Sequence, residues 1–243
     1  MSEALFEVLP WDSDNFHYRI AKVTKSTLTP ADVAVLKGCE TVDCFYLTAE
    51  LGDMETILAL NVPGVVLAEV RVDLDFKGSN LPESWSLQPA TEGEVDDLAA
   101  MSRNLYRDSR FYCDRHFRAE DADRLYETWI RQACAGTRGD QVLVVRMDGR
   151  PVGYSICQFK TPQVGSVPLL GVAKEARGQG LGVALMRGAV EWFSRRGADY
   201  VVATTQGRNI PLQRVLQAVG YRTSKISLMY HYWPRIPLPA AVG

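Results

Sequence analysis

The sequence predicts a mixed α/β (α+β) protein, in which helices flank a mixed central sheet and a smaller α/β module precedes it. Strand-like and helix-like runs alternate up to residue 75, a stretch rich in Gly, Pro, Asn and Ser covers 76–90, and sharper periodic signals fill the rest. We therefore predict an N-terminal module at 1–75, a linker at 76–90 and a main domain at 91–243.

In the N-terminal module, short strand-like runs alternate with two helix-like runs. Asp53 can cap the second helix, and Gly64 follows its end. The predicted strands are Tyr18–Thr24, Phe45–Ala49 and Val65–Asp73, and the predicted helices lie near 30–39 and 53–61.

The main domain begins with a clear helix start. Thr91 and Glu94 have the spacing of a capping box, in which each side chain satisfies a free backbone N–H of the first turn. Asp148-Gly149 marks a tight hairpin between two strands. The further predicted elements are a helix at 120–135, strands at 142–147, 151–159 and 164–173, a helix at 181–195, a strand at 200–205, a helix at 210–219 and a strand at 227–233.

Composition and charge are those of an ordinary soluble globular protein. The chain has 243 residues, 47% hydrophobic and 23% charged, with a formal net charge of −2. A nearly neutral chain has no global basic field that would recruit nucleic acid or a membrane surface. No signal-like segment and no apolar run of the roughly 20 residues that cross a bilayer is present. We expect a cytoplasmic protein without nucleic acid or membrane partners. The sequence does not determine the oligomeric state, and a homodimer is one possibility.

Cysteine and histidine usage gives no indication of a metal site. The five cysteines form no CxxC pair, and the three histidines have no HxxxH spacing. We expect buried free thiols and no metal cofactor.

A glycine-rich loop between a strand and a helix is the most informative feature. Gly178, Gly180 and Gly182 follow Arg177, after a strand that ends near Ala173. Closely spaced glycines let backbone N–H groups approach an anion, and the helix N-terminus adds further donors. The loop fits neither a GxGxxG dinucleotide loop nor a Walker loop. A pyrophosphate site is the favoured interpretation, and a merely tight turn is the alternative.

The loop also resembles a known family. Arg177-x-x-Gly180-x-Gly182 is similar to the [Q/R]xxGx[G/A] signature of the Gcn5-related N-acetyltransferase (GNAT) superfamily, and Asn209 precedes a helix that ends in Gly220-Tyr221, as in that superfamily. The resemblance spans about 91–233 and implies the GNAT fold, with acetyl-CoA as co-substrate. The implied cofactor-binding residues are Leu170, Gly171, Val172, Arg177, Gly178, Gln179, Gly180, Leu181, Gly182, Thr205 and Asn209.

A narrower resemblance covers most of the chain. Five short segments together resemble the dTDP-fucosamine acetyltransferase family: Leu9–Phe16, Gly64-x-x-Leu67-x-Glu69, Ser109–Phe111, Tyr126-x-x-Trp129-Ile130 and Ala203-x-Thr205-Gln206. This resemblance implies transfer of acetyl to the amine of a nucleotide-linked deoxyamino sugar, and an extra N-terminal module. Residues expected to contact the acceptor are Ser109, Arg110, Phe111 and Gln206.

Two catalytic roles follow from the resemblance. An alkyl amine is mostly protonated at neutral pH, so it needs a base before it can attack a thioester. The resemblance gives this role to Glu69; the alternative is a surface carboxylate beside Arg71. The oxyanion needs a donor, which in the superfamily is a backbone N–H at a bulge of the central strand, here near Leu170–Val172, with Val172 the predicted residue.

One departure from the superfamily affects the leaving group. A tyrosine often lies seven residues after the motif's asparagine and protonates the departing thiolate, but Leu216 occupies that position here. Tyr221, Tyr230 or water could replace it, and the sequence does not choose among them. Two other functions stay open: a GNAT N-acyltransferase for another small amine or a peptide, and a non-catalytic acyl-CoA-binding module. The sequence fixes neither acyl length nor sugar stereochemistry.

Overall fold

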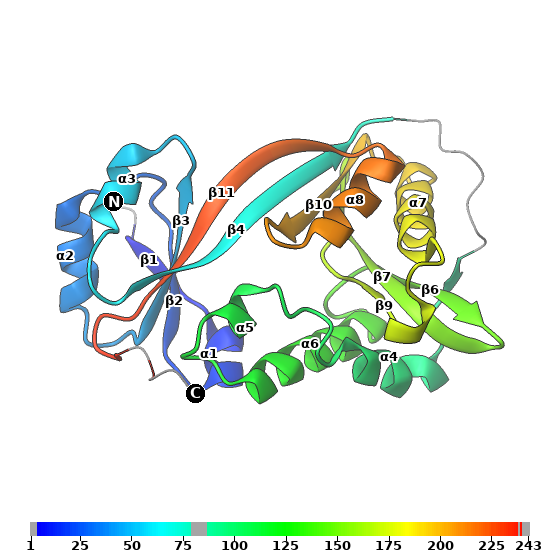
Figure 1. The fold of residues 1–243 in the computed structure, drawn as a ribbon, viewed down its shortest axis with the longest axis horizontal. Helices are drawn as coiled ribbons and strands as arrows, with labels where there is room; N and C mark the ends of the chain where they lie inside the picture. Colours follow the sequence, from blue (N-terminus) through cyan, green and yellow to red (C-terminus); the bar gives the residue numbers. More distant parts are fainter. Residues whose placement is uncertain (1–3, 79–86, 238, 240–243) are drawn as a thin grey trace. The chain divides into compact units, whose positions relative to one another are not determined.

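The computed structural model describes residues 4–78, 87–237 and 239 (Figure 1). The chain forms two compact units. Unit 1 comprises Met1–Arg71, Arg107–Ala122 and Ile226–Gly243, and unit 2 comprises Val72–Tyr106 and Asp123–Lys225. Each unit is therefore assembled from segments that are distant in the sequence.

Unit 1 is a small α/β structure. In its sheet β2 pairs with β1 antiparallel and with β3 parallel, and β3 pairs with β11 antiparallel. Buried apolar residues of β2, β3, α2 and α3 form its core. The elements that contribute to unit 1 are β1 (Phe6–Val8), α1 (Pro10–Phe16), β2 (Ile20–Val23), α2 (Pro30–Gly38), β3 (Cys44–Glu50), α3 (Met54–Ala59), the first part of β4 (Val65–Phe76), α5 (Arg110–Cys113), the start of α6 (Ala119–Cys134) and most of β11 (Arg222–Tyr232).

Capping groups fix the starts of α2 and α3 in unit 1. Thr29 and Asp32 form a capping box at the start of α2, with Pro30 in the first turn. The Asp53 side chain accepts a hydrogen bond from the Thr56 N–H at 3.0 Å, which confirms the predicted cap of α3.

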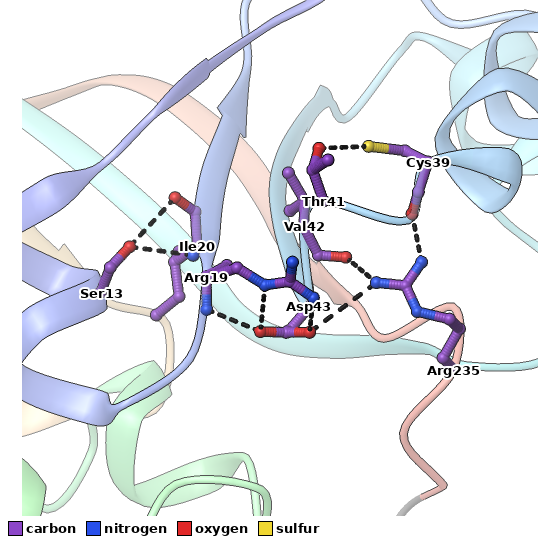
Figure 2. Close-up of polar contacts among 8 residues, drawn as sticks. All are labelled: Ser13, Arg19, Ile20, Cys39, Thr41, Val42, Asp43 and Arg235. Atoms are coloured by element: carbon purple, nitrogen blue, oxygen red, sulfur yellow. Dashed lines mark hydrogen bonds and ion pairs between the residues drawn. The ribbon is translucent and has the colours of Figure 1, made fainter.

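Charged groups tie the segment after β11 to the sheet of unit 1, as Figure 2 shows. Asp43 accepts hydrogen bonds from the Arg19 backbone and guanidinium at 2.8 and 3.1 Å, and lies 3.7 Å from the Arg235 guanidinium. Burial alone would raise the pKa of Asp43, but the hydrogen bonds from Arg19 outweigh it and lower that pKa. Arg235 also donates to the carbonyls of Cys39 and Val42, so the segment after β11 is fastened to the segment before β3.

Unit 2 carries the larger sheet. Its strand order is β4-β10-β8-β7-β6-β5, with β9 paired to β7; β8 and β10 are parallel, and β7 pairs antiparallel with β6, β8 and β9. Its core gathers apolar residues of α7 and α8 with those of β10. Its further elements are β5 (Gln88–Pro89), η1 (Glu92–Glu94), α4 (Val95–Ser102), β6 (Gln141–Met147), β7 (Arg150–Thr161), β8 (Val164–Val167), β9 (Leu170–Val172), η2 (Lys174–Ala176), α7 (Leu181–Ser194), β10 (Tyr200–Gln206) and α8 (Ile210–Val219).

The predicted fold class is confirmed, with differences in detail. The strand expected at 164–173 is two strands, because the pairing with β10 ends at Val167, whereas β7 pairs with both β8 and β9. Five short elements were not predicted: β1, α1, β5, α5 and η2. Of the expected linker at 76–90, residues 79–86 lie outside the described residues. The predicted division at 1–75, 76–90 and 91–243 stays a prediction. The units that the structure forms follow different bounds, because residues 107–122 and 226–243 belong to unit 1.

In the described part of the chain, no helix has the length and apolarity needed to cross a membrane.

Candidate active site

The broken strand of unit 2 leaves one edge of β9 open. The parallel pairing of β8 with β10 ends at Val167 and Ala203, and within the described residues β9 pairs only with β7. Pro168 lies at the break and has no N–H to donate to a neighbouring strand. The edge of β9 opposite β7 is therefore available to another hydrogen-bonding chain or ligand.

The pairing of β9 with β7 identifies the groups on that open edge. The Ile156 N–H donates to the Leu169 carbonyl, and the Ala173 N–H donates to the Val152 carbonyl, both at 2.9 Å. Hydrogen-bonded and non-hydrogen-bonded pairs alternate along an antiparallel ladder, so the backbone of Gly171 faces β7. The backbone groups of the two residues beside it, Leu170 and Val172, consequently face the open edge.

Gly171 was expected to bind the cofactor, but its backbone pairs with Tyr154 in β7 and does not face the open edge. Its contribution to a cofactor site would therefore come from the absence of a side chain. A Cβ atom built on Gly171 would lie 2.5 Å from Leu105 and 2.8 Å from the Tyr154 ring. Only glycine lets these two side chains cover the strand.

The three loop glycines serve different purposes. Gly178 and Gly180 have φ values of 79° and 78°, a left-handed conformation that residues with a Cβ atom rarely adopt. Gly180 is the N-cap of α7 and makes no side-chain cap, so the first N–H groups of this helix point into the loop. A Cβ atom on Gly182 would lie 3.2 Å from Val215 of α8, so this glycine allows close helix packing. These turns and the uncapped helix start suit an anion, and the role of the loop as its binding site stays a prediction.

A cavity of about 770 Å³ adjoins the end of β9 and the start of the loop. Its charged residues include four cations and two carboxylates, which gives it a positive balance, although Arg103 is paired with Glu127. Arg177 lines it and donates from Nε to the Val172 carbonyl at 3.3 Å. A ligand with phosphate groups fits this charge. The lining residues are Asp97, Met101, Arg103, Asn104, Leu105, Arg150, Pro151, Ala173, Lys174, Glu175 and Arg177.

The remaining expected cofactor and acceptor residues of unit 2 have varied surroundings. Thr205 is fully buried, and its hydroxyl has no hydrogen-bond partner among the described residues. Asn209 caps α8, since its side-chain oxygen accepts from the Leu212 N–H at 3.2 Å. Leu181 packs in the core with 2% exposure, whereas Gln179 is exposed and Gln206 is half-buried.

Glu69, the expected base, is buried in unit 1. It is 9% exposed, which distinguishes it from the surface carboxylate that was the alternative. Its Oε2 accepts a hydrogen bond from the Arg110 N–H at 3.2 Å. Unit 1 thus brings together Glu69 and the first residue of α5, which lie 41 positions apart in the sequence.

The three side chains of the Ser109–Phe111 segment have different surroundings. The Arg110 guanidinium lies over the rings of Tyr46 and Phe111, at 4.1 and 4.6 Å from their centroids. Phe111 is 7% exposed and stacks on Phe16 at 5.0 Å, so it packs mainly in the core. Ser109 is 4% exposed, and its hydroxyl has no hydrogen-bond partner in the described residues. Arg110 is therefore the member of the segment best suited to meet an anionic acceptor.

A buried polar cluster beside α5 was not predicted. Asp114 accepts hydrogen bonds from Nδ1 of His116 and of His231, both at 2.7 Å, and from Nε1 of Trp233 at 2.9 Å. Burial alone would raise the pKa of Asp114, but these donors lower it below its usual value. Burial lowers the pKa of His231 to about 4. Asp114 and His231 lie 117 positions apart, so no sequence spacing could have indicated this cluster.

The expected site residues thus form two groups. Unit 1 contains Glu69, Ser109, Arg110 and Phe111, and unit 2 contains the cofactor loop, β9, Thr205, Gln206 and Asn209. Among the described residues, His, Cys, Asp and Glu side chains form no group of three or more that could hold a metal ion.

Comparisons with known proteins agree with this geometry. Residues 102–221 match the acetyltransferase (GNAT) family. The chain is 28% identical to dTDP-fucosamine acetyltransferase from Escherichia coli over 88% of this chain and 92% of that protein. It is 22% identical to the spore coat polysaccharide biosynthesis protein SpsD from Bacillus subtilis over 63% of this chain, and spans only about half of that relative, 52%. The structure of a GCN5-related N-acetyltransferase from Kribbella flavida superposes with a TM-score of 0.56 at 15% identity, covering 88% of this chain and 81% of that one.

The fold, the loop and the matched segment define an N-acetyltransferase. The segment that matches the acetyltransferase (GNAT) family contains the signature around Arg177 and Gly180 that indicated this family.

Proposed function

We propose that this protein transfers an acetyl group from acetyl-CoA to the amine of a nucleotide-linked deoxyamino sugar. The observation that carries the proposal is the match to dTDP-fucosamine acetyltransferase over 88% of this chain and 92% of that protein. A match of this extent extends well beyond the acetyltransferase segment at 102–221 and includes most of unit 1.

The cofactor half of the proposal rests on unit 2. The backbone N–H groups of the Gly178–Gly182 loop would bind the diphosphate of CoA, and the cationic cavity beside it would receive further phosphate. The pantetheine amides would pair with the open edge of β9, as an added strand pairs with a sheet. The Val172 N–H on that edge would then stabilise the oxyanion of the tetrahedral intermediate.

The acceptor half rests on unit 1. Glu69 is a buried carboxylate that would take a proton from the amine as it attacks the thioester. The Arg110 guanidinium would bind the acceptor diphosphate through charge-assisted hydrogen bonds. Ser109 and Phe111 would shape the surroundings of the sugar and base.

Acetyl transfer to a panel of amines tests the proposal. Thiol release from acetyl-CoA would be followed with dTDP-linked amino sugars, the corresponding free amino sugars, simple alkyl amines and a peptide N-terminus. We expect the dTDP-linked sugars to have by far the highest kcat/KM. Efficient turnover of a simple amine, without turnover of dTDP-linked sugars, would replace this function by that of a small-amine N-acetyltransferase. CoA binding without any thiol release would indicate a non-catalytic module.

The variant Arg110→Ala tests the acceptor site directly. We expect a higher KM for the dTDP-amino sugar, because charge-assisted hydrogen bonds are worth about 1.5–3 kcal/mol each, with little change in the KM for acetyl-CoA. Arg118→Ala removes another unit 1 arginine, whose side chain is 75% exposed and whose only described ion pair, with Glu120, is long at 3.5 Å, and it serves as control. Equal KM values in the two variants would exclude Arg110 from the acceptor site.

A further inference from the structure

Two tyrosine hydroxyls of unit 2 meet beside the strand proposed to hold the thioester. The hydroxyls of Tyr106 and Tyr154 are 2.7 Å apart, a short hydrogen bond. Tyr154 lies on β7 directly opposite Gly171, and residues opposite each other on antiparallel strands present their side chains to the same face. The Tyr154 ring therefore covers Gly171, whose neighbours Leu170 and Val172 carry the open-edge N–H groups.

Close contact supports this placement. A Cβ atom on Gly171 would lie 2.8 Å from Cζ of Tyr154, the ring carbon that bears the hydroxyl. The hydroxyl end of this ring thus lies against the backbone of β9, and Tyr106 is one hydrogen bond further on. No other residue type at position 171 would allow the pair to lie so close to the strand.

Several contacts hold Tyr106 in this position. Asn104 has a left-handed backbone with φ of 58°, and its N–H donates to the Asp123 carboxylate at 2.8 Å. The Tyr106 ring packs on that of Tyr126, with centroids 4.3 Å apart. Tyr106 itself is half-buried, so its side chain is not sealed within the core.

The direction of the hydroxyl hydrogen bond follows from burial. Tyr154 is fully buried, and donation of its O–H to the Tyr106 oxygen satisfies a group that would otherwise be costly to bury. Burial raises the pKa of Tyr154, although the hydrogen bond with Tyr106 partly offsets this effect, so Tyr154 keeps its proton at any working pH. In this arrangement Tyr106 accepts from Tyr154, so this bond does not use the Tyr106 hydroxyl hydrogen.

The residues considered earlier as donors of the leaving-group proton lie in the buried cores of the two units. Leu216, at the position where the superfamily often has tyrosine, is fully buried in the core of unit 2. Tyr221 belongs to the same core, and its buried hydroxyl has no hydrogen-bond partner in the described residues. Tyr230 lies on β11 and is buried in the core of unit 1.

We propose that Tyr106 is the acid that protonates the sulfur of the departing CoA, and that Tyr154 is a positioning residue that stabilises the Tyr106 phenolate. The proposal rests on the proposed function. The amine nitrogen bonds to the thioester carbon and loses a proton to the base. The C–S bond then breaks, its electron pair goes to sulfur, and the proton of Tyr106 moves to sulfur. Water returns a proton to Tyr106, and the base gives its proton to solvent.

Thiol release by three Tyr→Phe variants tests this role, using whichever amine the wild type turns over most efficiently. For Tyr106→Phe we expect kcat about 10²-fold lower at pH 7, as for loss of a general acid, with unchanged acetyl-CoA affinity in calorimetry. For Tyr154→Phe we expect a loss of about tenfold, since the acid remains but its phenolate is less stabilised. Tyr221→Phe, which removes a buried hydroxyl from the core, should retain wild-type kcat.

The pH profile separates an acid from a structural residue. A free thiol has a pKa of about 8.5, so above this pH the thiolate departs without needing a proton. The deficit of Tyr106→Phe should therefore narrow as pH rises past that value. A wild-type kcat in Tyr106→Phe, a deficit constant at all pH values, or an equal loss in Tyr221→Phe would overturn this role while leaving acetyl transfer intact. Absence of thiol release by the wild type with every amine would instead overturn the proposed function, and this role with it.

Discussion

Glu69 combines burial with a hydrogen bond from the Arg110 backbone, and both features shape a test of its role as a base. Glu69→Gln keeps an oxygen that can accept from the Arg110 N–H, but removes the proton acceptor. We expect kcat to fall by about 10²–10⁴-fold and acetyl-CoA affinity to stay unchanged. Steady-state kinetics at neutral pH provide the measurement. Near-normal turnover would transfer the role to water or to another carboxylate.

His231 makes the stability of unit 1 sensitive to acid. Burial lowers its pKa from 6.5 to about 4, so between these values the unfolded chain binds a proton that the folded chain excludes. Stability should therefore be complete above pH 6.5 and should fall as pH decreases toward 4. The difference between a pKa of 6.5 and one of about 4 corresponds to a loss of about 3 kcal/mol at most. Urea unfolding at pH 7, 6, 5 and 4.5 measures it.

Two asparagine variants separate His231 from the other groups that titrate in this range. His231→Asn should show a weaker dependence of unfolding free energy on pH than the wild type. His17→Asn removes an exposed histidine whose φ of 59° asparagine tolerates, and should keep the wild-type dependence. Equal pH slopes in all three proteins would show that His231 is not the group responsible.

At the scale of elements, α7 offers a matched pair of glycines at its two ends. Gly180 precedes this helix of 14 residues and Gly197 follows it, with φ values of 78° and 83°, and no atom lies within 4 Å of a Cβ built on either. The two positions are about 20 Å apart along the helix axis. Replacement by alanine strains both turns by a similar amount, about 1–2 kcal/mol, but only Gly180 belongs to the proposed CoA loop.

We expect Gly180→Ala to weaken CoA binding at least about tenfold, a change of about 1.4 kcal/mol, because the strained turn no longer presents its N–H groups to the diphosphate. Gly197→Ala should bind CoA like the wild type. Calorimetry on both variants, after circular dichroism has shown them folded, measures the difference. Unchanged affinity in a folded Gly180→Ala protein would exclude this loop as the diphosphate site.

The elements found from the sequence are those with strong local signals. The capping groups at Asp53 and Thr91, the hairpin at Asp148-Gly149 and the glycines before α7 each act over a few residues, and the structure confirms them. The break between β8 and β9 was missed, because the apolar pattern continues through it and only the end of the pairing with β10 reveals it. Helix α5 was missed because four residues are too few for a periodic signal.

At the scale of the whole molecule, long-range contacts determine which segments belong together. A boundary placed from composition follows the chain, whereas unit 1 recruits residues 107–122 and 226–243. The same limit explains why the Asp114 cluster was missed and why sequence spacing could not indicate the contact of Glu69 with Arg110. The cofactor loop is contiguous in sequence, and for that reason its residues could be named in advance.

This composition of unit 1 predicts how its N-terminal part behaves alone. In the intact chain β3 pairs with residues 227–232 of β11, and the buried side chains of Trp233 and His231 both donate to Asp114. A fragment of residues 1–75 lacks all of these groups and would leave one edge of β3 and part of the core exposed. We expect it to show no cooperative thermal transition by circular dichroism, whereas the full chain, measured in parallel, unfolds cooperatively. A cooperative transition and a dispersed NMR spectrum from the fragment would instead establish 1–75 as an independent domain.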